Sequence, residues 1–108
     1  MILSKIQIRS SESNRNEMLQ VVSSFLGPSR YADGCEGFWL YEDLYEKNNL
    51  ELFSQWQSQE SLDQYIRSSH FSQLLNLLEL SEKSPEMLFY EVSDIKGIEV
   101  VESVRLQR

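Results

Sequence analysis

The start of the chain alternates apolar and polar residues, and this period of two predicts a β-strand. Ile2, Ile6 and Ile8 share one face of that strand, with mainly polar side chains on the other. Further strands are predicted where aromatic and branched residues gather, over residues 35–43, 50–57 and 86–93. The polar residues 46–49 are expected to form a hairpin turn between the second and third strands.

Between the strands, apolar residues recur at helical spacing. The first set consists of Met18, Val22, Phe25 and Leu26. Ser11 or Ser13 is expected to cap the start of this helix, and Gly27-Pro28 is expected to end it. Asp33-Gly34 then predicts a turn before the second strand.

A second helical region follows the third strand. Ser58 is expected to begin a short helix that carries Leu62, Tyr65 and Ile66. A further helical segment is marked by apolar residues at i, i+3, i+4 and i+7, which are Phe71, Leu74, Leu75 and Leu78. Pro85 is expected to end the helical region, because proline cannot donate a backbone hydrogen bond.

The predicted order of elements is β-α-β-β-α-β, the split βαβ arrangement of a ferredoxin-like α+β fold with a four-stranded antiparallel sheet. Large apolar residues fall on both faces of that sheet. In the second strand, Trp39 and Tyr41 lie opposite Phe38, and in the third strand Phe53 lies opposite Trp56. Each apolar face of the sheet must be buried against another layer. The helices are expected to bury one face and a second copy of the chain the other, which predicts a homodimer through the sheet face.

The last residues, 94–108, exceed the four-strand pattern. Residues 98–106 alternate in a strand-like way, outside the core expected over residues 2–93. With 108 residues and no linker rich in proline and glycine, the whole chain is expected to form one domain.

The chain is acidic, with a formal net charge of −7. This charge repels the phosphates of nucleic acid and anionic membrane surfaces, so neither is an expected partner.

No apolar run approaches the roughly 18 residues of a membrane-spanning helix, and the N-terminal alternation differs from a signal peptide. Cys35 is the one cysteine, so no internal disulfide can form. These features predict a cytoplasmic protein.

The most distinctive pattern of the chain lies between Tyr31 and Leu75. It consists of a Gly34-Cys35 turn that enters a strand, a strand that ends at Trp56, then Ser58-Gln59-Glu60-Ser61-Leu62-Asp63 and Tyr65-Ile66-Arg67-Ser68-Ser69-His70-Phe71. This order resembles the antibiotic biosynthesis monooxygenase family, over roughly residues 2–92. The resemblance implies a dimeric α/β barrel, with C-terminal segments that reach across the dimer. It also implies oxidation of a small phenol-like or quinol-like aromatic molecule without a cofactor.

Tyr65 and His70 are the candidate catalytic residues. The resemblance places Tyr65, three residues after Leu62, where many family members have a histidine. A phenol has a pKa near 10, so Tyr65 is suited to hydrogen-bond an oxyanion rather than to act as a base. His70 has an ordinary pKa near neutrality and would serve as a base or donor at a pocket edge. The structural alternatives are an aromatic that packs helix on sheet and an exposed residue that begins a helix.

Six residues are candidates for substrate binding: Gln7, Arg9, Trp39, Tyr41, Trp56 and Phe71. The aromatic side chains suit a pocket for a planar ligand, and Gln7 and Arg9 could orient a phenolate or quinone oxygen. The alternative is that they pack the core or the dimer seam. With one histidine and one cysteine in the chain, no metal site is expected. No organic cofactor is expected either, because the chain has no phosphate loop or nucleotide-binding glycine run and the resemblance implies chemistry without a cofactor.

Two other functions compete with the oxygenase. The absence of a histidine at position 65 also fits a non-catalytic module that binds a small ligand or serves as an accessory dimer. The haem-degrading branch of the superfamily uses an Asn on the first strand, a Trp in the helix and a His ligand. The matching positions hold Gln7, Tyr65 and Leu75, and the missing ligand argues against haem degradation.

Overall fold

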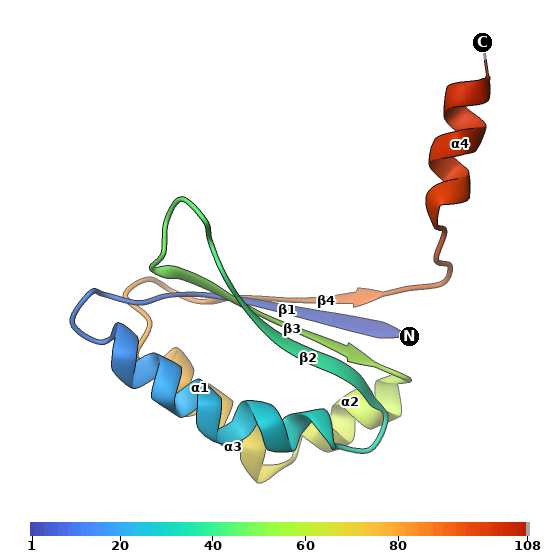
Figure 1. The fold of residues 1–108 in the computed structure, drawn as a ribbon. Coiled ribbons are helices and arrows are strands. Elements are labelled where there is room, and N and C mark those ends of the chain that lie inside the picture. Colours follow the sequence, from blue (N-terminus) through green and yellow to red (C-terminus); the bar gives the residue numbers. More distant parts are fainter. Residues whose placement is uncertain (108) are drawn as a thin grey trace.

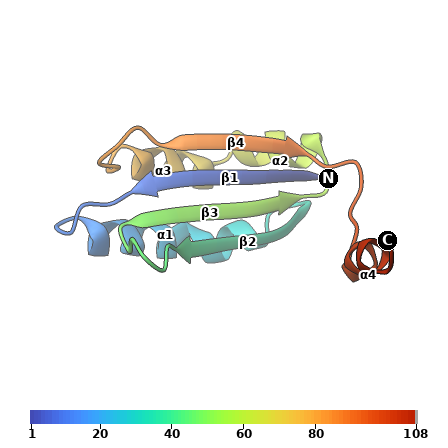
Figure 2. The same cartoon turned by 90° about the horizontal axis from the view of Figure 1, so that it is seen from above.

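Four antiparallel strands form one sheet in the order β2-β3-β1-β4, and helices cover one of its faces (Figure 1, Figure 2). The computed structural model describes residues 1–107. The elements are β1 (Ile2–Arg9), α1 (Arg15–Arg30), β2 (Cys35–Glu42), β3 (Asn49–Trp56), α2 (Gln59–Ile66), α3 (Ser69–Leu78), β4 (Glu86–Glu91) and α4 (Ile98–Leu106). The predicted ferredoxin-like α+β fold is confirmed, with α2 and α3 together forming the second helical region.

The core lies between the sheet and the helix layer formed by α1, α2 and α3. In β1, the buried Ile6 and Ile8 are paired with the buried Leu52 and Leu50 of β3. The helix layer adds Met18, Val22, Phe25, Leu62, Tyr65, Phe71, Leu74 and Leu77. Burial of each large apolar side chain contributes about 1.5 to 3 kcal/mol, so the alternation in β1 and β3 orients the whole sheet toward these helices.

The apolar face of α3 differs in part from the one predicted. Phe71 and Leu74 are buried as expected, but Leu77 is the third buried residue and Leu75 is about half exposed. The helix ends at Leu78, well before Pro85, and its capping residue Glu79 donates its backbone N–H to Asn76 and Leu77. The buried stripe of the helix therefore has i, i+3, i+6 spacing, and the predicted Leu78 packs against the core as a partly buried residue beside it.

The two ends of α1 also depart from prediction. Asn14 occupies the N-cap position, while Ser11 exchanges two hydrogen bonds with it and stabilises the turn before the helix. At the other end the helix continues through Pro28 to Arg30. Proline has a helix-compatible φ, and one missing backbone donor so close to the helix end costs only one hydrogen bond.

The strand-like alternation of residues 98–106 does not correspond to a strand, because this segment forms the helix α4. Strand pairing needs a neighbouring strand, and the segment leaves the sheet after β4 (Figure 1). Its backbone groups are satisfied within a helix instead. In the described range 1–107, no helix combines the length and apolar character needed to cross a membrane.

The face of the sheet opposite the helix layer, called the open face below, carries the other set of alternating side chains. Its residues are Leu3, Lys5, Gln7, Trp39, Tyr41, Glu51, Phe53, Gln55, Glu86, Leu88 and Tyr90. Trp39 and Tyr41 are 38% and 52% exposed. The predicted division of large apolar groups between the two faces is therefore confirmed.

Trp39 lies flat against the sheet because its neighbour Gly37 has no side chain. A Cβ at Gly37 would come within 2.1 Å of the Cη2 atom of Trp39. The indole therefore covers the backbone of its own strand instead of standing away from the open face.

The turn between α1 and β2 depends on Gly34. This residue has a backbone φ of +77°, a conformation that is strained for any residue with a Cβ atom. A Cβ here would also lie 2.0 Å from the Oγ atom of Ser61. Ser61 itself donates its backbone N–H to the N-cap Ser58. Gly34 thus allows the start of α2 to pack against the turn.

Gly34→Ala is expected to lower the free energy of unfolding by about 1 to 3 kcal/mol, because it combines a strained φ with a steric clash. Gly27→Ala is the matched control, since a Cβ at Gly27 meets no atom within 4 Å. Alanine in this helical position should instead add about 0.5 to 1 kcal/mol. Urea unfolding followed by circular dichroism measures both values. Equal effects of the two substitutions would contradict this account of the turn.

Candidate functional site

A hollow of about 460 Å³ lies at the end of the open face next to the β2-β3 hairpin. Three of the predicted substrate-binding residues, Gln7, Arg9 and Tyr41, line it. The other lining residues are Ile8, Glu42, Asp43, Glu46, Asn49, Leu50, Glu51, Lys83, Ser84 and Glu86. The hollow is therefore mainly polar, with one aromatic wall.

The strand register builds the floor of this hollow from one row of side chains. Gln7 pairs with Glu51 of β3 on one side and with Glu86 of β4 on the other, and Glu51 pairs with Tyr41 of β2. The Nε2 atom of Gln7 donates to Oε1 of Glu51 at 2.6 Å. Lys5 approaches the same oxygen at 3.6 Å. A ligand over this row would meet an amide, two carboxylates and a phenol.

Glu51 and Glu86 were not among the residues predicted from sequence. They lie 35 positions apart, on strands β3 and β4, which do not pair with each other in the sheet. Only the pairing of both strands with β1 brings the two carboxylates to either side of Gln7. The available signal was their position on the polar side of each alternating strand, which does not by itself reveal the register.

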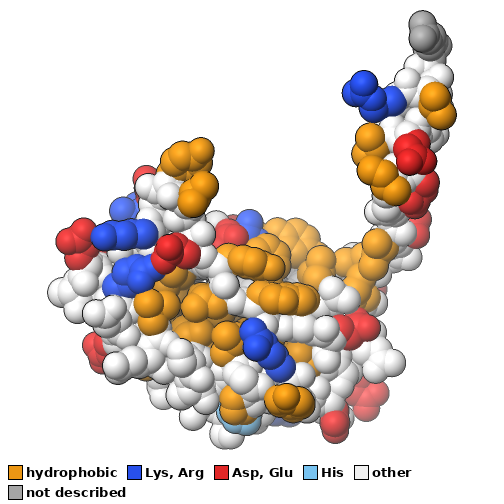
Figure 3. All heavy atoms as spheres, viewed as in Figure 1, with side chains coloured by type: hydrophobic (Ala, Val, Ile, Leu, Met, Phe, Trp, Pro, Cys, Tyr) orange, Lys and Arg blue, Asp and Glu red, His pale blue; other side chains and the backbone are white. Residues whose placement is uncertain are grey.

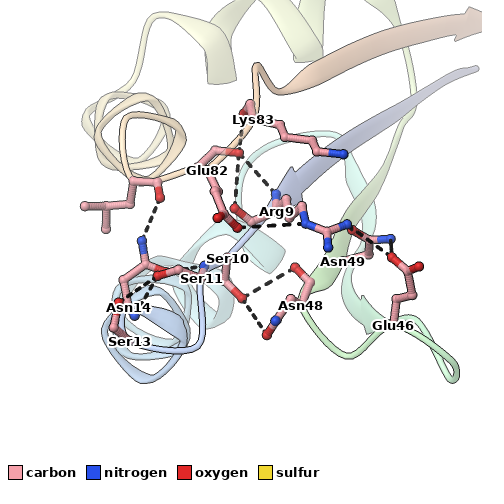
Figure 4. A network of polar contacts seen from close by, with 12 residues as sticks. Arg9, Ser10, Ser11, Ser13, Asn14, Glu46, Asn48, Asn49, Glu82 and Lys83 are labelled. Atoms are coloured by element: carbon pink, nitrogen blue, oxygen red, sulfur yellow. Dashed lines mark hydrogen bonds and ion pairs between the residues drawn. The ribbon is translucent and has the colours of Figure 1, made fainter.

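Arg9 is held by groups of its own chain at the rim of the hollow (Figure 4). Its Nη1 atom donates to Oε2 of Glu46 at 3.1 Å and to Oδ1 of Asn49 at 3.2 Å. Its Nε atom lies 3.9 Å from a carboxylate oxygen of Glu82. The guanidinium thus links the end of β1 to the hairpin and to the segment before β4. In this arrangement Arg9 shapes the rim more than it offers a free cation.

The charge of the hollow favours ligands that donate hydrogen bonds. Five carboxylates line it, against the two cations Arg9 and Lys83. Backbone N–H groups of Tyr45 and Glu46 donate to Asp43 and hold the pKa of its carboxyl below its usual value. A hollow with this surplus of acceptors repels anions and suits a neutral molecule with hydroxyl groups.

A second group of predicted residues lies in the core, on the helix side of the sheet. The rings of Tyr65 and Trp56 stack with centroids 4.7 Å apart, and Phe71 meets Tyr65 edge-on at 5.8 Å. The hydroxyl groups of Tyr65 and Ser29 share a buried hydrogen bond of 2.8 Å. Trp56 donates its indole N–H to Ser54 at 2.8 Å. These polar atoms are satisfied inside the protein.

The eight predicted site residues therefore do not form one cluster. Gln7, Arg9 and Tyr41 line the hollow, and Trp39 lies on the same open face beside Phe53. Trp56, Tyr65 and Phe71 pack in the core. His70 is half-buried in the first turn of α3. Among residues 1–107, no three His, Cys, Asp or Glu side chains gather in a way that could hold a metal ion.

Burial raises the pKa of Tyr65 to about 12, although the hydrogen bond with Ser29 acts in the opposite direction. An unfolded tyrosine ionises near pH 10. The folded protein therefore keeps the phenol proton over a range in which the unfolded chain loses it. Its contribution to stability is complete below pH 10 and is lost as the pH rises through 12.

The alkaline decline in stability between pH 10 and 12 is expected to shrink by about 2 to 3 kcal/mol in Tyr65→Phe. Near neutral pH the same variant should lose only about 1 kcal/mol, because the ring remains and one hydrogen bond is removed. Ser29→Ala is the control, since it removes the hydrogen bond but keeps the phenol and hence the decline. Urea unfolding across this pH range provides the measurement. An unchanged alkaline decline in Tyr65→Phe would contradict the assignment.

Known proteins share this fold closely. A crystal structure from Deinococcus radiodurans, of a protein assigned to the antibiotic biosynthesis monooxygenases, superposes with a TM-score of 0.83 at 17% identity, over 91% of this chain and 98% of that one. A conserved protein of Methanosarcina mazei has a TM-score of 0.77 at 27% identity, over 82% and 89% of the two chains. These likenesses describe a common architecture.

Sequence comparison points to the same group. An uncharacterised protein of Synechocystis is 27% identical over 99 residues, which is 92% of this chain, and the chain spans 63% of that relative's length. The family model described as antibiotic biosynthesis monooxygenase matches residues 1–76, from β1 through most of α3. The chain therefore belongs to the antibiotic biosynthesis monooxygenase family.

Proposed function

We propose that the chain works as a homodimer that binds a small, hydroxylated aromatic molecule over the open face and oxidises it with dioxygen, without metal or organic cofactor. The observation that carries this proposal is the combination of an uncovered aromatic surface with a hollow rich in hydrogen-bond acceptors on the same sheet face. Antibiotic biosynthesis monooxygenases are generally dimeric.

The dimer follows from the character of the open face. Tyr41 and Phe53 meet edge-on at 5.8 Å, and Phe53 is paired with Trp39. Leu88 and Tyr90 of β4 extend the surface, and both are about 40% exposed. Contiguous apolar surface of this kind usually marks an interface, since its burial releases ordered water. A second copy would also close the hollow from above and exclude water from a bound substrate.

The chemistry needs only a proton acceptor and a dry site. A phenolic substrate donates its hydroxyl to the carboxylate of Glu51 or Glu86, which accepts the proton as one electron passes to dioxygen. The aryloxyl radical and the superoxide then combine at a ring carbon that bears a hydrogen, and the carboxylate returns its proton to the terminal oxygen to give a hydroperoxide. The O–O bond breaks as water leaves with the hydrogen of that ring carbon, and the remaining oxygen makes the ring a quinone. Substrate and dioxygen are thus converted to quinone and water.

Tyr65 takes no direct part in this scheme. Its hydroxyl is bonded to Ser29 inside the core, and the sheet separates it from the hollow. This observation also favours a second candidate function, the non-catalytic binding of the same class of ligand. None of the described residues that line the hollow is a histidine, which fits binding without catalysis. Because both candidate functions involve the same class of ligand, a measurement of turnover distinguishes the oxygenase from the binding module.

Phe53→Asp is expected to convert the dimer to a monomer, because an unpaired carboxylate at the interface costs several kcal/mol. Gln73→Asp is the control, since it adds the same charge on the exposed side of α3. Light scattering at micromolar concentration should give about twice 12.7 kDa for the parent chain and the control. A parent chain that stays monomeric at every concentration would refute the dimer.

Oxygen uptake on addition of hydroquinones or anthrones, with a chelator present and no flavin, is expected to exceed the buffer blank. Glu51→Gln should reduce turnover about ten- to a hundredfold, because the amide cannot accept the proton. Glu79→Gln, outside the hollow, should not change it. Saturable quenching of Trp39 fluorescence without oxygen uptake across the panel would leave only the binding function.

A further inference from the structure

The two cations that line the hollow differ in whether a carboxylate already neutralises them. Arg9 lies within ion-pair distance of Glu46 and Glu82. Lys83 makes no ion pair with any of residues 1–107, and no contact reaches its ammonium group (Figure 4). Its side chain is exposed and lines the hollow. Lys83 therefore provides the positive charge that remains available to a bound molecule.

The segment that carries Lys83 is fixed to the end of β1. Glu82 donates its backbone N–H to the carbonyl oxygen of Arg9 at 2.7 Å. The hydroxyl group of Ser81 accepts the backbone N–H of Arg9 at 3.1 Å and donates to the carbonyl oxygen of Lys83 at 2.6 Å. The backbone of Lys83 is thus held at the rim, three residues before Glu86, while its long side chain is free to move toward the hollow.

The charge around Lys83 decides what kind of ion it can attract. Charged side chains of both signs gather at the hairpin end of the molecule, and hydrophobic side chains follow the sheet (Figure 3). Five carboxylates line the hollow, so a small anion formed there is repelled from most of its surface. The free ammonium group of Lys83 is the place where such an anion would be stabilised. This attraction strengthens when a second copy of the chain excludes water from the hollow.

The proposed oxidation forms an anion of this kind. Transfer of one electron from the substrate to dioxygen gives superoxide, whose negative charge develops as the electron moves. A fixed positive charge beside a developing negative charge lowers the energy of the transition state. Without it, superoxide formed among carboxylates would tend to leave the hollow before it combines with the aryloxyl radical.

The hollow has room for dioxygen beside the substrate. Its volume of about 460 Å³ lies within the range of about 300 to 1,000 Å³ that is usual for drug-sized ligands, so one phenol ring fills only part of it. Glu51 lies on β3, whereas Lys83 precedes β4, and β1 lies between the two strands. A phenol bound to Glu51 would therefore leave the end of the hollow next to Lys83 for dioxygen.

We propose that Lys83 binds the superoxide formed in this reaction and directs it to the ring carbon. The inference rests on the oxygenase of the proposed function and adds to it the site of dioxygen reduction. As one electron passes to dioxygen, the phenol proton moves to Glu51 and the ammonium group pairs with superoxide without giving up a proton. The bond between oxygen and the ring carbon then forms, Glu51 returns its proton to the peroxide, and Lys83 is unchanged at the end.

Lys83→Gln tests this role, because it removes the charge and keeps a hydrogen-bonding side chain at an exposed position. With a hydroquinone as substrate, quinone formation should fall about tenfold. The superoxide released per quinone formed, measured by the dismutase-sensitive reduction of cytochrome c, should rise severalfold. Lys83→Arg keeps the charge and should retain most of the activity of the parent. Arg67→Gln removes a cation from the exposed side of the helix layer and should change neither quantity.

Binding of the hydroquinone without dioxygen, followed by quenching of tryptophan fluorescence, separates this role from substrate binding. The dissociation constant of Lys83→Gln should stay within about twofold of the parent value. Weaker binding without additional superoxide release would make Lys83 a substrate-binding residue and would overturn the proposal. Slower turnover without additional superoxide, or no change in either quantity, would also overturn it and leave the oxygenase in place. A parent chain with no oxygen uptake above the blank would remove the oxygenase and this inference together.

Discussion

The pairing of β1 with both β3 and β4 is the constraint on which the rest of the structure depends. β1 is the strand through which β4 joins the sheet, and its alternation decides which side chains face the helices. A shift of one residue would turn Ile6 and Ile8 to the open face and Gln7 into the core. The same register that builds the core thus also assembles the row of Tyr41, Glu51, Gln7 and Glu86.

The residues of the core and those at the rim of the hollow are held by different kinds of interaction. On the helix side, Trp56, Tyr65 and Phe71 pack ring against ring, and their polar atoms find partners within the protein. On the open side, charged residues remain near water, and Arg9 links two loops through exposed and half-exposed groups. Such surface ion pairs contribute little to stability. Their value lies in fixing the shape of the rim, which leaves the floor of the hollow available for a ligand.

The fold was predictable from sequence because it depends on periodicity, and the site was less so because it depends on register. The strands over residues 35–43, 50–57 and 86–93 end within two residues of the observed elements. Tyr65 and Trp56 have an apolar body and a polar tip, so a core position and a pocket position look the same in sequence. The alternation of residues 98–106 suggested a strand, but α4 has no strand to pair with where it leaves the sheet. Long-range pairing was the missing information in each case.

The contact between Gly37 and Trp39 has a consequence for how this part of the chain can change during evolution. The indole occupies the space that any side chain at position 37 would need. The two positions are two residues apart on one strand and compete for the same area of sheet. A larger residue at position 37 is therefore compatible only with a smaller residue at position 39, or with a side chain there that adopts another rotamer. Among relatives that keep this strand, the two positions should vary together, and drift at one is limited by the identity of the other.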